Sequence, residues 1–147
     1  MSYICNVSTD KTSFSSPSVF TSEETTRGIR ILVRAHYASE HSDPAQQLWR
    51  FFYTVRITNE STDTVQLISR HWIITDAADH IEEIKGLGVV GQQPELKPGD
   101  AFEYTSNCPL RTPFGIMHGT YQMVTNTGIQ FDATIAPFTL SGPYTLH

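Results

Sequence analysis

The stretch Arg70–Pro94 reads RHWIITDAADHIEEIKGLGVVGQQP and decides the fold of this chain. It opens with an apolar run at His71–Ile74, turns at Asp76–Asp79 and returns through His80–Ile84 into the glycine-rich segment Gly86–Gly91. Two short apolar runs joined by a polar turn predict a pair of β-strands. Histidine and acidic side chains gather beside the turn, so we expect any functional site to lie in this stretch.

The strand pattern continues outward from this stretch in both directions. Apolar and polar residues alternate through Gly28–Tyr37 and Leu48–Thr58, as in half-buried strands. Val65–Thr75 has apolar residues on both faces, which predicts a central strand that is covered on both sides. We expect Trp72, within that strand, to be buried between two sheets. Further strands are predicted at Ala101–Ser106, Gly115–Thr125 and Ile129–Leu140.

No segment shows convincing helical periodicity. Seven or more short strands, separated by turn signals at regular spacing, predict an all-β fold. We therefore expect an antiparallel β-sandwich of the immunoglobulin or fibronectin type III kind.

Length, charge and cysteine content narrow the class of protein. The 147 residues suit one globular domain, and a net charge of −5 argues against general nucleic-acid binding, which needs a basic surface. No apolar run is long enough to span a membrane, and the N-terminus does not resemble a secretory signal. Cys5 and Cys108 form no disulfide framework. We expect a cytoplasmic protein that contacts neither a membrane nor nucleic acid in general.

Serine and threonine dominate residues 1–26. This segment has too few apolar side chains to offset the entropy lost on ordering, so we predict a flexible N-terminal segment that folding does not need. The folded domain would then comprise residues 27–147. A short edge strand at Ser18–Phe20 is the alternative.

The segment Gly86–Gly91 reads GLGVVG and matches the Gly-x-Gly-x-x-Gly pattern of dinucleotide-binding folds. Those folds need a helix directly after the glycines and an acidic residue about 20 positions later. Here Pro94 follows closely, no helical pattern begins, and Arg111 stands where the acidic residue would be. We therefore reject a dinucleotide-binding fold.

Two interpretations of the glycines remain open. Either the chain needs glycine for a tight turn or bulge, or consecutive backbone N–H groups form a concavity that binds an anion. In the second case basic side chains would supply the compensating charge for a phosphate or pyrophosphate. The candidate phosphate-binding residues are Gly86, Gly88, Gly91, Lys85 and Arg70.

The spacing of other reactive side chains supports no further chemistry. The acidic and histidine residues near the turn follow no recognised metal-ligand spacing, so we expect a solvated acidic tip. These residues are His71, Asp76, Asp79, His80, Glu82 and Glu83. Nothing beside Cys108 indicates an activated nucleophile. We predict no metal site, no cofactor and no catalytic residue, and hence no enzymatic activity.

Several long motifs, in the same order, closely resemble the ApaG family across about residues 28–147. They are Val65–Asp76 (VQLISRHWIITD), Gly86–Pro94 (GLGVVGQQP), Pro98–Ser106 (PGDAFEYTS) and Gly119–Met123 (GTYQM). The resemblance implies a fibronectin type III or immunoglobulin-like sandwich. Similar domains in eukaryotic F-box and polymerase-associated proteins look like interaction modules. The family's name is linked to diadenosine tetraphosphate metabolism and to cobalt and magnesium resistance.

Our first functional hypothesis is a non-enzymatic binding module whose Gly86–Gly91 loop takes a phosphate-bearing small molecule, such as pyrophosphate or a nucleotide. The alternatives are a protein–protein interaction module, a role in cobalt and magnesium homeostasis and, less favoured, an enzyme acting on dinucleotide polyphosphates. Leu87 and Gln92 replace two glutamates of the family's common loop. That replacement disfavours a metal in the loop and favours an anion, which meets less repulsion there.

Overall fold

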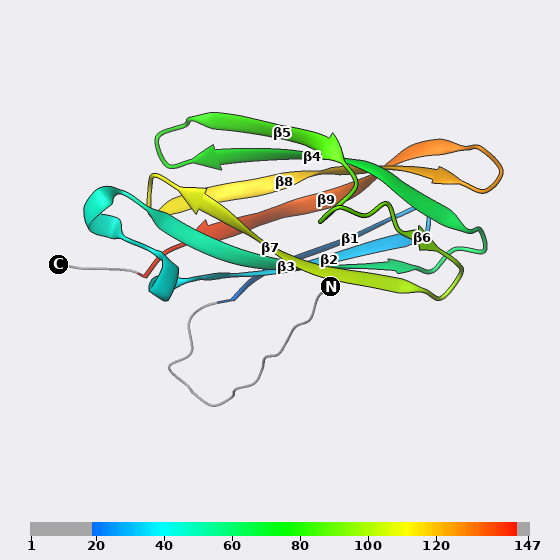
Figure 1. Cartoon of the computed structure of the whole chain (residues 1–147), viewed down its shortest axis with the longest axis horizontal. Helices are drawn as coiled ribbons and strands as arrows, with labels where there is room; N and C mark the ends of the chain where they lie inside the picture. The colour runs from blue at the N-terminus through cyan, green and yellow to red at the C-terminus, as the bar shows by residue number, and fades with distance from the viewer. Residues whose placement is uncertain (1–18, 144–147) are drawn as a thin grey trace, which may run out of the picture.

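A computed structural model describes residues 19–143, which fold as an all-β sandwich (Figure 1). The described residues form nine strands and two short 3-10 turns. The strands are β1 (Phe20–Thr26), β2 (Ile29–Tyr37), β3 (Trp49–Asn59), β4 (Val65–Asp76), β5 (Ile81–Leu87), β6 (Glu95–Leu96), β7 (Ala101–Leu110), β8 (Phe114–Thr125) and β9 (Gln130–Ser141). The 3-10 turns are η2 (Ser39–His41) and η3 (Pro44–Gln46). None of the helical segments described is long and apolar enough to cross a membrane.

The strands form two antiparallel sheets, and the predicted fold class is confirmed. One sheet has the order β1-β2-β3-β7. The other has the order β5-β4-β8-β9, with the short β6 also paired to β4. The two sheets form the two layers of the sandwich, with β1 beside β9 at one side and β7 below β5 at the other (Figure 1).

Alternation along the strands builds the core between the sheets. The apolar stripe of β2, beginning at Ile29, is buried as predicted, and so are Phe51 and Tyr53 of β3. Trp72 is only 2% exposed, which confirms its predicted burial between the sheets. Its indole ring packs edge-on against the ring of Tyr53, 5.4 Å away on the opposite sheet. Edge-to-face aromatic pairs of this kind add stability beyond the area they bury.

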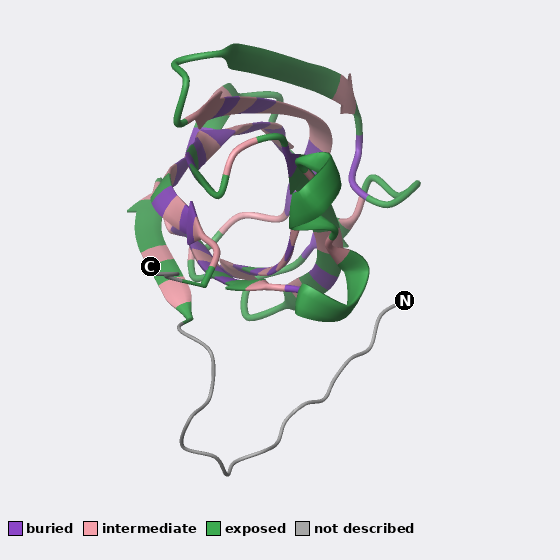
Figure 2. Cartoon of the chain, turned by 90° about the vertical axis from the view of Figure 1, so that its left-hand side faces the viewer, coloured by how far each residue is buried: buried purple, intermediate pink, exposed green. Residues whose placement is uncertain are grey.

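The prediction for β4 is half right. The strand is central, between β5 and β8, but the sandwich covers only one of its faces. A bulge between Leu67 and Ser69 shifts the register by one residue. Leu67 before the bulge and Trp72 after it therefore both lie on the inner face, although an odd-numbered and an even-numbered residue lie on opposite faces of a regular strand. Outer-face Ile73 is half-buried, and Figure 2 shows the mixed burial along the strand.

The predicted flexible segment 1–26 is wrong for Phe20–Thr26, which form β1, whereas residues 1–18 lie outside the described residues. A two-residue turn at Arg27 and Gly28, both with positive φ, joins β1 to β2. Such a turn suits a tight hairpin. The folded domain therefore begins before residue 27, and the ladder hydrogen bonds with β2, rather than apolar burial, specify the strand.

Candidate functional site

The β4–β5 hairpin presents its two faces to different surroundings. Arg70 pairs with Gly86 and Trp72 with Ile84 on the inner face. On the outer face His71 pairs with Lys85. Directly paired residues point to the same side of a sheet and neighbours along a strand alternate. Arg70 and Lys85 therefore lie on opposite faces of the hairpin.

Arg70 is held on the inner face by the start of the glycine loop. Its Nη1 atom donates hydrogen bonds to the carbonyl oxygens of Leu87, at 3.0 Å, and Gly88, at 2.8 Å. The guanidinium also covers the α-carbon of Gly86: a β-carbon there would come within 2.8 Å of the Arg70 Nη2 atom. A β-carbon at position 86 would therefore require the guanidinium to shift from its present place.

Two tyrosine hydroxyl groups lie in the core on the inner side of Arg70. The hydroxyl groups of Tyr104 and Tyr121 hydrogen bond to one another, and Tyr121 is the partner of Arg70 on β8. Burial raises the pKa of Tyr53 to about 12 and also raises the pKa of Tyr104, whereas the charge of Arg70 acts to lower both. The charge of Arg70 therefore acts on phenol groups in the interior of the sandwich.

No carboxylate among residues 19–143 forms an ion pair with Arg70. By contrast, Arg30 is paired with Glu23 and Glu60, and Arg56 with Glu103, all on the surface. A half-buried cation without an anionic partner gains from an opposite charge, because its charge is partly removed from water. Arg70 is thus the cation of the hairpin best placed to hold an anion.

The glycine loop itself is a tight turn. The Gly88 N–H donates to the Ile68 carbonyl at 2.8 Å, and Val89 and Gln92 exchange two backbone hydrogen bonds at 2.8 and 2.9 Å. The φ angles of Gly88, Val90 and Gly91 are +63°, +42° and +80°. The N–H groups of Gly88, Val89 and Gln92 therefore face carbonyl oxygens of the chain and do not form the expected anion cradle.

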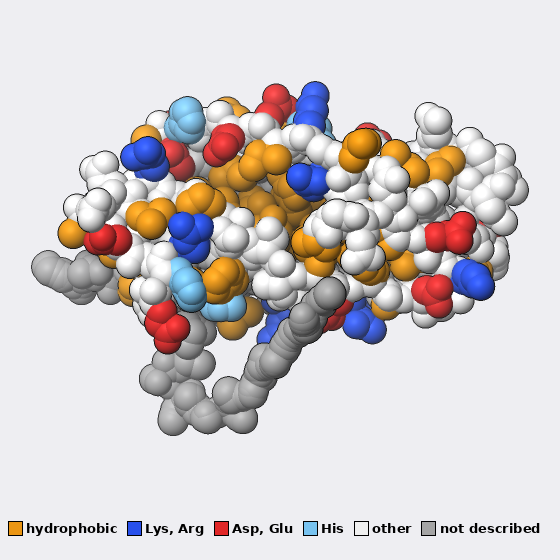
Figure 3. All heavy atoms as spheres, viewed as in Figure 1, with side chains coloured by type: hydrophobic (Ala, Val, Ile, Leu, Met, Phe, Trp, Pro, Cys, Tyr) orange, Lys and Arg blue, Asp and Glu red, His pale blue; other side chains and the backbone are white. Residues whose placement is uncertain are grey.

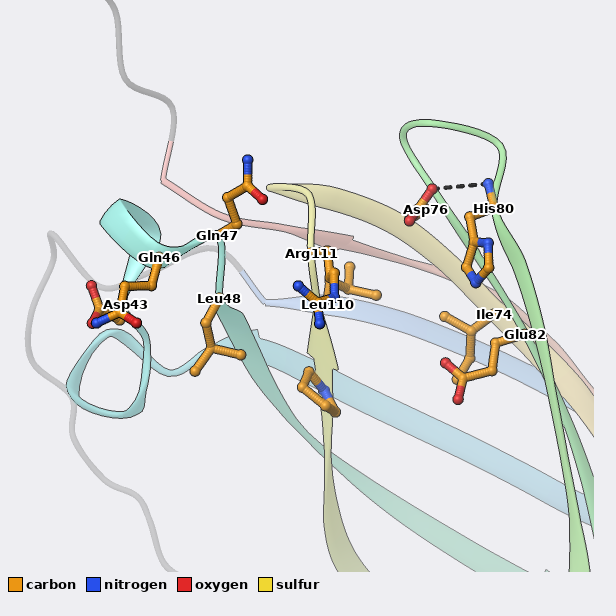
Figure 4. A pocket seen from close by; sticks show the side chains of 11 residues that line it. Asp43, Gln46, Gln47, Leu48, Ile74, Asp76, His80, Glu82, Leu110 and Arg111 are labelled. Carbon is orange, nitrogen blue, oxygen red and sulfur yellow. Dashed lines mark hydrogen bonds between the residues drawn. The ribbon is translucent and has the colours of Figure 1, made fainter.

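A cleft of about 670 Å³ opens at the end of the sandwich where the β4–β5 turn lies (Figure 4). Asp76, His80 and Glu82 reach it from the hairpin, and the opposite side is formed by the loop around η3 and the end of β7. The lining residues are Asp43, Gln46, Gln47, Leu48, Ile74, Asp76, His80, Glu82, Pro109, Leu110 and Arg111. Sequence reasoning found the three hairpin residues but missed Gln46, Gln47 and Arg111, since these lie in loops without a recognisable pattern.

The charged groups of the cleft do not assemble a metal site. The carboxylate of Asp76 accepts the backbone N–H groups of Ala78 and His80, at 2.8 and 3.0 Å, and so shapes the turn. Among the described residues no group of three or more histidine, cysteine or acidic side chains is placed to hold a metal ion. On the outer face, His71 Nε2 instead lies 2.9 Å from a carboxylate oxygen of Glu83.

Cys108 is a free, buried thiol on the inner face of β7. Burial, with a smaller contribution from the charge of Glu82, raises the pKa of this thiol to about 12. The thiol therefore stays protonated near neutral pH, unlike the thiolate that a nucleophilic cysteine needs.

Figure 3 shows an apolar hollow between β5 and β7, with basic and acidic side chains at its margin.

Comparison with known proteins places this chain in a family. The model of the ApaG domain (DUF525) matches residues 39–125. The chain belongs to the ApaG family. Protein ApaG of Bordetella pertussis is 56% identical over 119 residues, which are 81% of this chain and 91% of that protein. Protein ApaG of Anaeromyxobacter dehalogenans is 53% identical over 122 residues, 83% and 96% of the two chains.

Solved structures of similar proteins agree with the fold. The crystal structure of an ApaA protein from Bordetella pertussis has a TM-score of 0.77 and 55% sequence identity, and it covers 80% of this chain and 95% of that one. The resemblance to the ApaG family inferred from the motifs is therefore confirmed. Within this ApaG sandwich, the structure brings Arg70, Gly86 and Gly88 together, places Lys85 on the opposite face, and leaves Gly91 at the exposed turn.

Proposed function

We propose that this protein is a non-enzymatic binding module that takes a phosphate-bearing small molecule, such as pyrophosphate or a nucleotide, at Arg70. The observation that carries the proposal is the half-buried guanidinium of Arg70, which has no anionic partner among the described residues. Guanidinium groups bind phosphate oxygens through paired, charge-assisted hydrogen bonds. An anion at Arg70 would therefore compensate a charge that the fold leaves unpaired.

The contact would be made by a side chain and not by the loop amides. Hydrogen bonds to Leu87 and Gly88 occupy one nitrogen of the guanidinium and fix its orientation. Gly86 keeps the space that the guanidinium needs. The apolar hollow between β5 and β7 would receive the rest of the ligand, whereas Lys85 on the outer face would contribute only a distant charge.

Binding without turnover fits the state of two buried groups in the interior of the sandwich. The pKa values of Tyr53 and Cys108 are both raised to about 12 by burial, so neither side chain supplies a base or a nucleophile at neutral pH. The module would hold its ligand and release it unchanged.

Calorimetric titration with pyrophosphate and with ADP tests the proposal. We expect Arg70→Gln to weaken binding by at least about tenfold, because hydrogen bonds between charged groups are lost. Lys85→Gln is the matched control: it removes the same charge from the other face of the hairpin and should leave affinity within about twofold. No heat from the wild-type protein with millimolar pyrophosphate would refute anion binding. Release of phosphate during the titration would refute the non-enzymatic role.

A protein-interaction role is the second candidate, and one observation favours it. β5 lies at the margin of its sheet, and three of its residues, Ile81, Ile84 and Leu87, are exposed hydrophobics. Exposed apolar side chains on an edge strand commonly mark a binding surface.

A further inference from the structure

β5 is an open edge. It pairs with β4 on one side, and no described strand pairs with it on the other. Six of its seven residues are exposed and the seventh, Gly86, is intermediate. Figure 2 shows the strand as a green band at the margin of the molecule. It has neither a proline nor a bulge, two devices that commonly protect an edge from pairing with another chain.

The hydrogen-bonding groups that β5 offers are defined by its pairing with β4. The Gly88 N–H donates to the Ile68 carbonyl, and the Asp76 N–H donates to the His80 carbonyl, just beyond the two ends of the strand. In an antiparallel ladder, such bonded pairs recur at every second residue. The even-numbered residues of β5 therefore bond to β4. The odd-numbered residues point their N–H and C=O groups outward, and these are Ile81, Glu83, Lys85 and Leu87.

The side chains of β5 are complementary to the same strand read backwards. The sequence is IEEIKGL, with Ile84 at its centre. Residues at equal distances from Ile84 are complementary. Glu83 and Lys85 have opposite charges, and Ile81 and Leu87 are both apolar, with exposed fractions of 61% and 75%. The remaining pair, Glu82 and Gly86, brings no like charges together.

We propose that β5 is a homodimerisation strand, which pairs antiparallel with β5 of a second copy of this chain about a two-fold axis at Ile84. In this register Glu83 of each copy faces Lys85 of the other, and Ile81 faces Leu87. Ile84 meets its own counterpart. The two five-stranded sheets become one continuous sheet, and the interface is self-complementary, as two-fold symmetry requires.

The register follows from both the backbone and the charges. The inner faces of the two sheets lie on the same side only when odd-numbered residues of one copy pair with odd-numbered residues of the other. The same pairing brings the outward-pointing N–H and C=O groups of the two strands opposite one another, so that they can hydrogen bond. A two-fold axis at Glu83 would oppose two glutamates, and an axis at Lys85 would oppose two lysines. Like charges directly opposite one another destabilise a sheet. Among axes at the three central residues of the strand, only the axis at Ile84 avoids both repulsions, and it is also the axis that pairs all seven residues of β5.

Sedimentation velocity of the full chain over a concentration series tests the proposal. We expect a monomer–dimer equilibrium for the wild-type chain. Glu83→Lys and Lys85→Glu, tested separately, should each raise the dissociation constant by at least about tenfold, because each turns two attractive pairs into repulsive ones. Lys85→Glu is the cleaner single variant, since Glu83 also contacts His71. Melting temperatures should confirm that each variant is folded.

Mixing makes the prediction specific to this register. The Glu83→Lys chain is basic at both positions and the Lys85→Glu chain is acidic at both, so an equimolar mixture should form heterodimers. The double variant E83K/K85E should again dimerise with itself, within about threefold of the wild type. A wild-type chain that stays monomeric up to about 1 mM would overturn the proposal. Unaltered dimerisation of both single variants, or no recovery in the mixture, would do so as well.

Discussion

Gly88 and Gly91 both have positive φ angles, but their surroundings differ. A β-carbon at Gly88 would overlap the carbonyl oxygen of Gln92, whereas a β-carbon at Gly91 meets nothing within 4 Å. We expect Gly91→Ala to cost roughly 1–2 kcal/mol of unfolding free energy, from backbone conformation alone. Gly88→Ala should cost roughly 3 kcal/mol or more, because the turn itself must move. Urea denaturation of both variants measures the difference, and equal costs would show that the turn yields easily.

The buried thiol of Cys108 makes stability depend on alkaline pH. Its pKa rises from the ordinary value of 9.0 to about 12 in the fold, so the folded chain retains a proton that the unfolded chain loses. The stabilisation is complete below pH 9 and is lost as pH rises towards 12, at up to about 1.4 kcal/mol per pH unit.

Cys108→Ala should therefore show a shallower loss of unfolding free energy above pH 9 than the wild type, measured by urea denaturation at several pH values. The variant starts from a lower stability because it leaves a cavity. The contribution of Tyr53, whose pKa is also raised, is common to both proteins and cancels in the comparison. Parallel profiles would mean that the thiol ionises freely in the fold.

The sequence identified Arg70 and Gly86 as candidates but did not show how they are arranged. A motif made of glycines suggests bonds from the backbone, whereas the loop amides of Gly88 and Val89 bind carbonyl oxygens of the chain. The bulge near Leu67 determines which face of the strand Arg70 occupies. Alternation of residue types does not reveal a bulge, nor the change of face that follows it. Anion binding itself stays a prediction.

At the scale of elements, β1 and the two-residue β6 are strands that the sequence did not predict, and β1 is the longer of the two. Its alternation is hidden because, of the four residues on its inward side, Phe20, Ser22, Glu24 and Thr26, only Phe20 is apolar. Ser22 Oγ donates to the Ala136 carbonyl at 2.8 Å, and Thr26 Oγ1 accepts the Thr134 N–H at 3.1 Å. These bonds tie β1 to β9 of the opposite sheet. The other long strands have large apolar side chains on one face, and for that reason composition and period sufficed to locate them.

A chain shortened to begin at Arg27 should therefore lose stability, contrary to the prediction made for a flexible segment. Removing β1 exposes the edge of β2 along seven paired positions. It also leaves the Ala136 carbonyl and the Thr134 N–H of β9 without their partners on β1. We expect the melting temperature to fall by at least about 5 °C, which corresponds to about 1 kcal/mol or more for a domain of this size. A chain that begins at Val19 keeps β1 and is the matched control. Equal melting temperatures would show that β1 contributes nothing.

At the scale of the whole molecule, the two ends of the sandwich are built differently. One end is open: the β4–β5 turn and the loop around η3 stand apart and leave the cleft of Figure 4. The other end is closed around Asn59, the last residue of β3, which is fully buried although its sequence neighbours are typical of a polar turn. An amide can be buried only if its hydrogen bonds are made, and a sequence does not show where those partners lie.

The closed end gives the last prediction. The Asn59 Nδ2 atom donates to the carbonyl oxygens of Asp63, at 2.7 Å, and Leu96, at 2.9 Å, and its Oδ1 atom accepts from the backbone and hydroxyl of Ser61. One side chain thus joins β3 of one sheet to β6 of the other. Asn59→Ala leaves several buried partners unsatisfied and should cost roughly 3 kcal/mol or more in urea denaturation.

Asn107→Ala is the control, because Asn107 makes its bond to Arg50 on the exposed surface and should cost at most about 0.5 kcal/mol. If the two variants unfold at the same urea concentration, water must replace the lost partners of Asn59 without penalty, and this end of the sandwich would have to admit solvent. A large difference instead means that a single buried amide fixes how the two sheets meet.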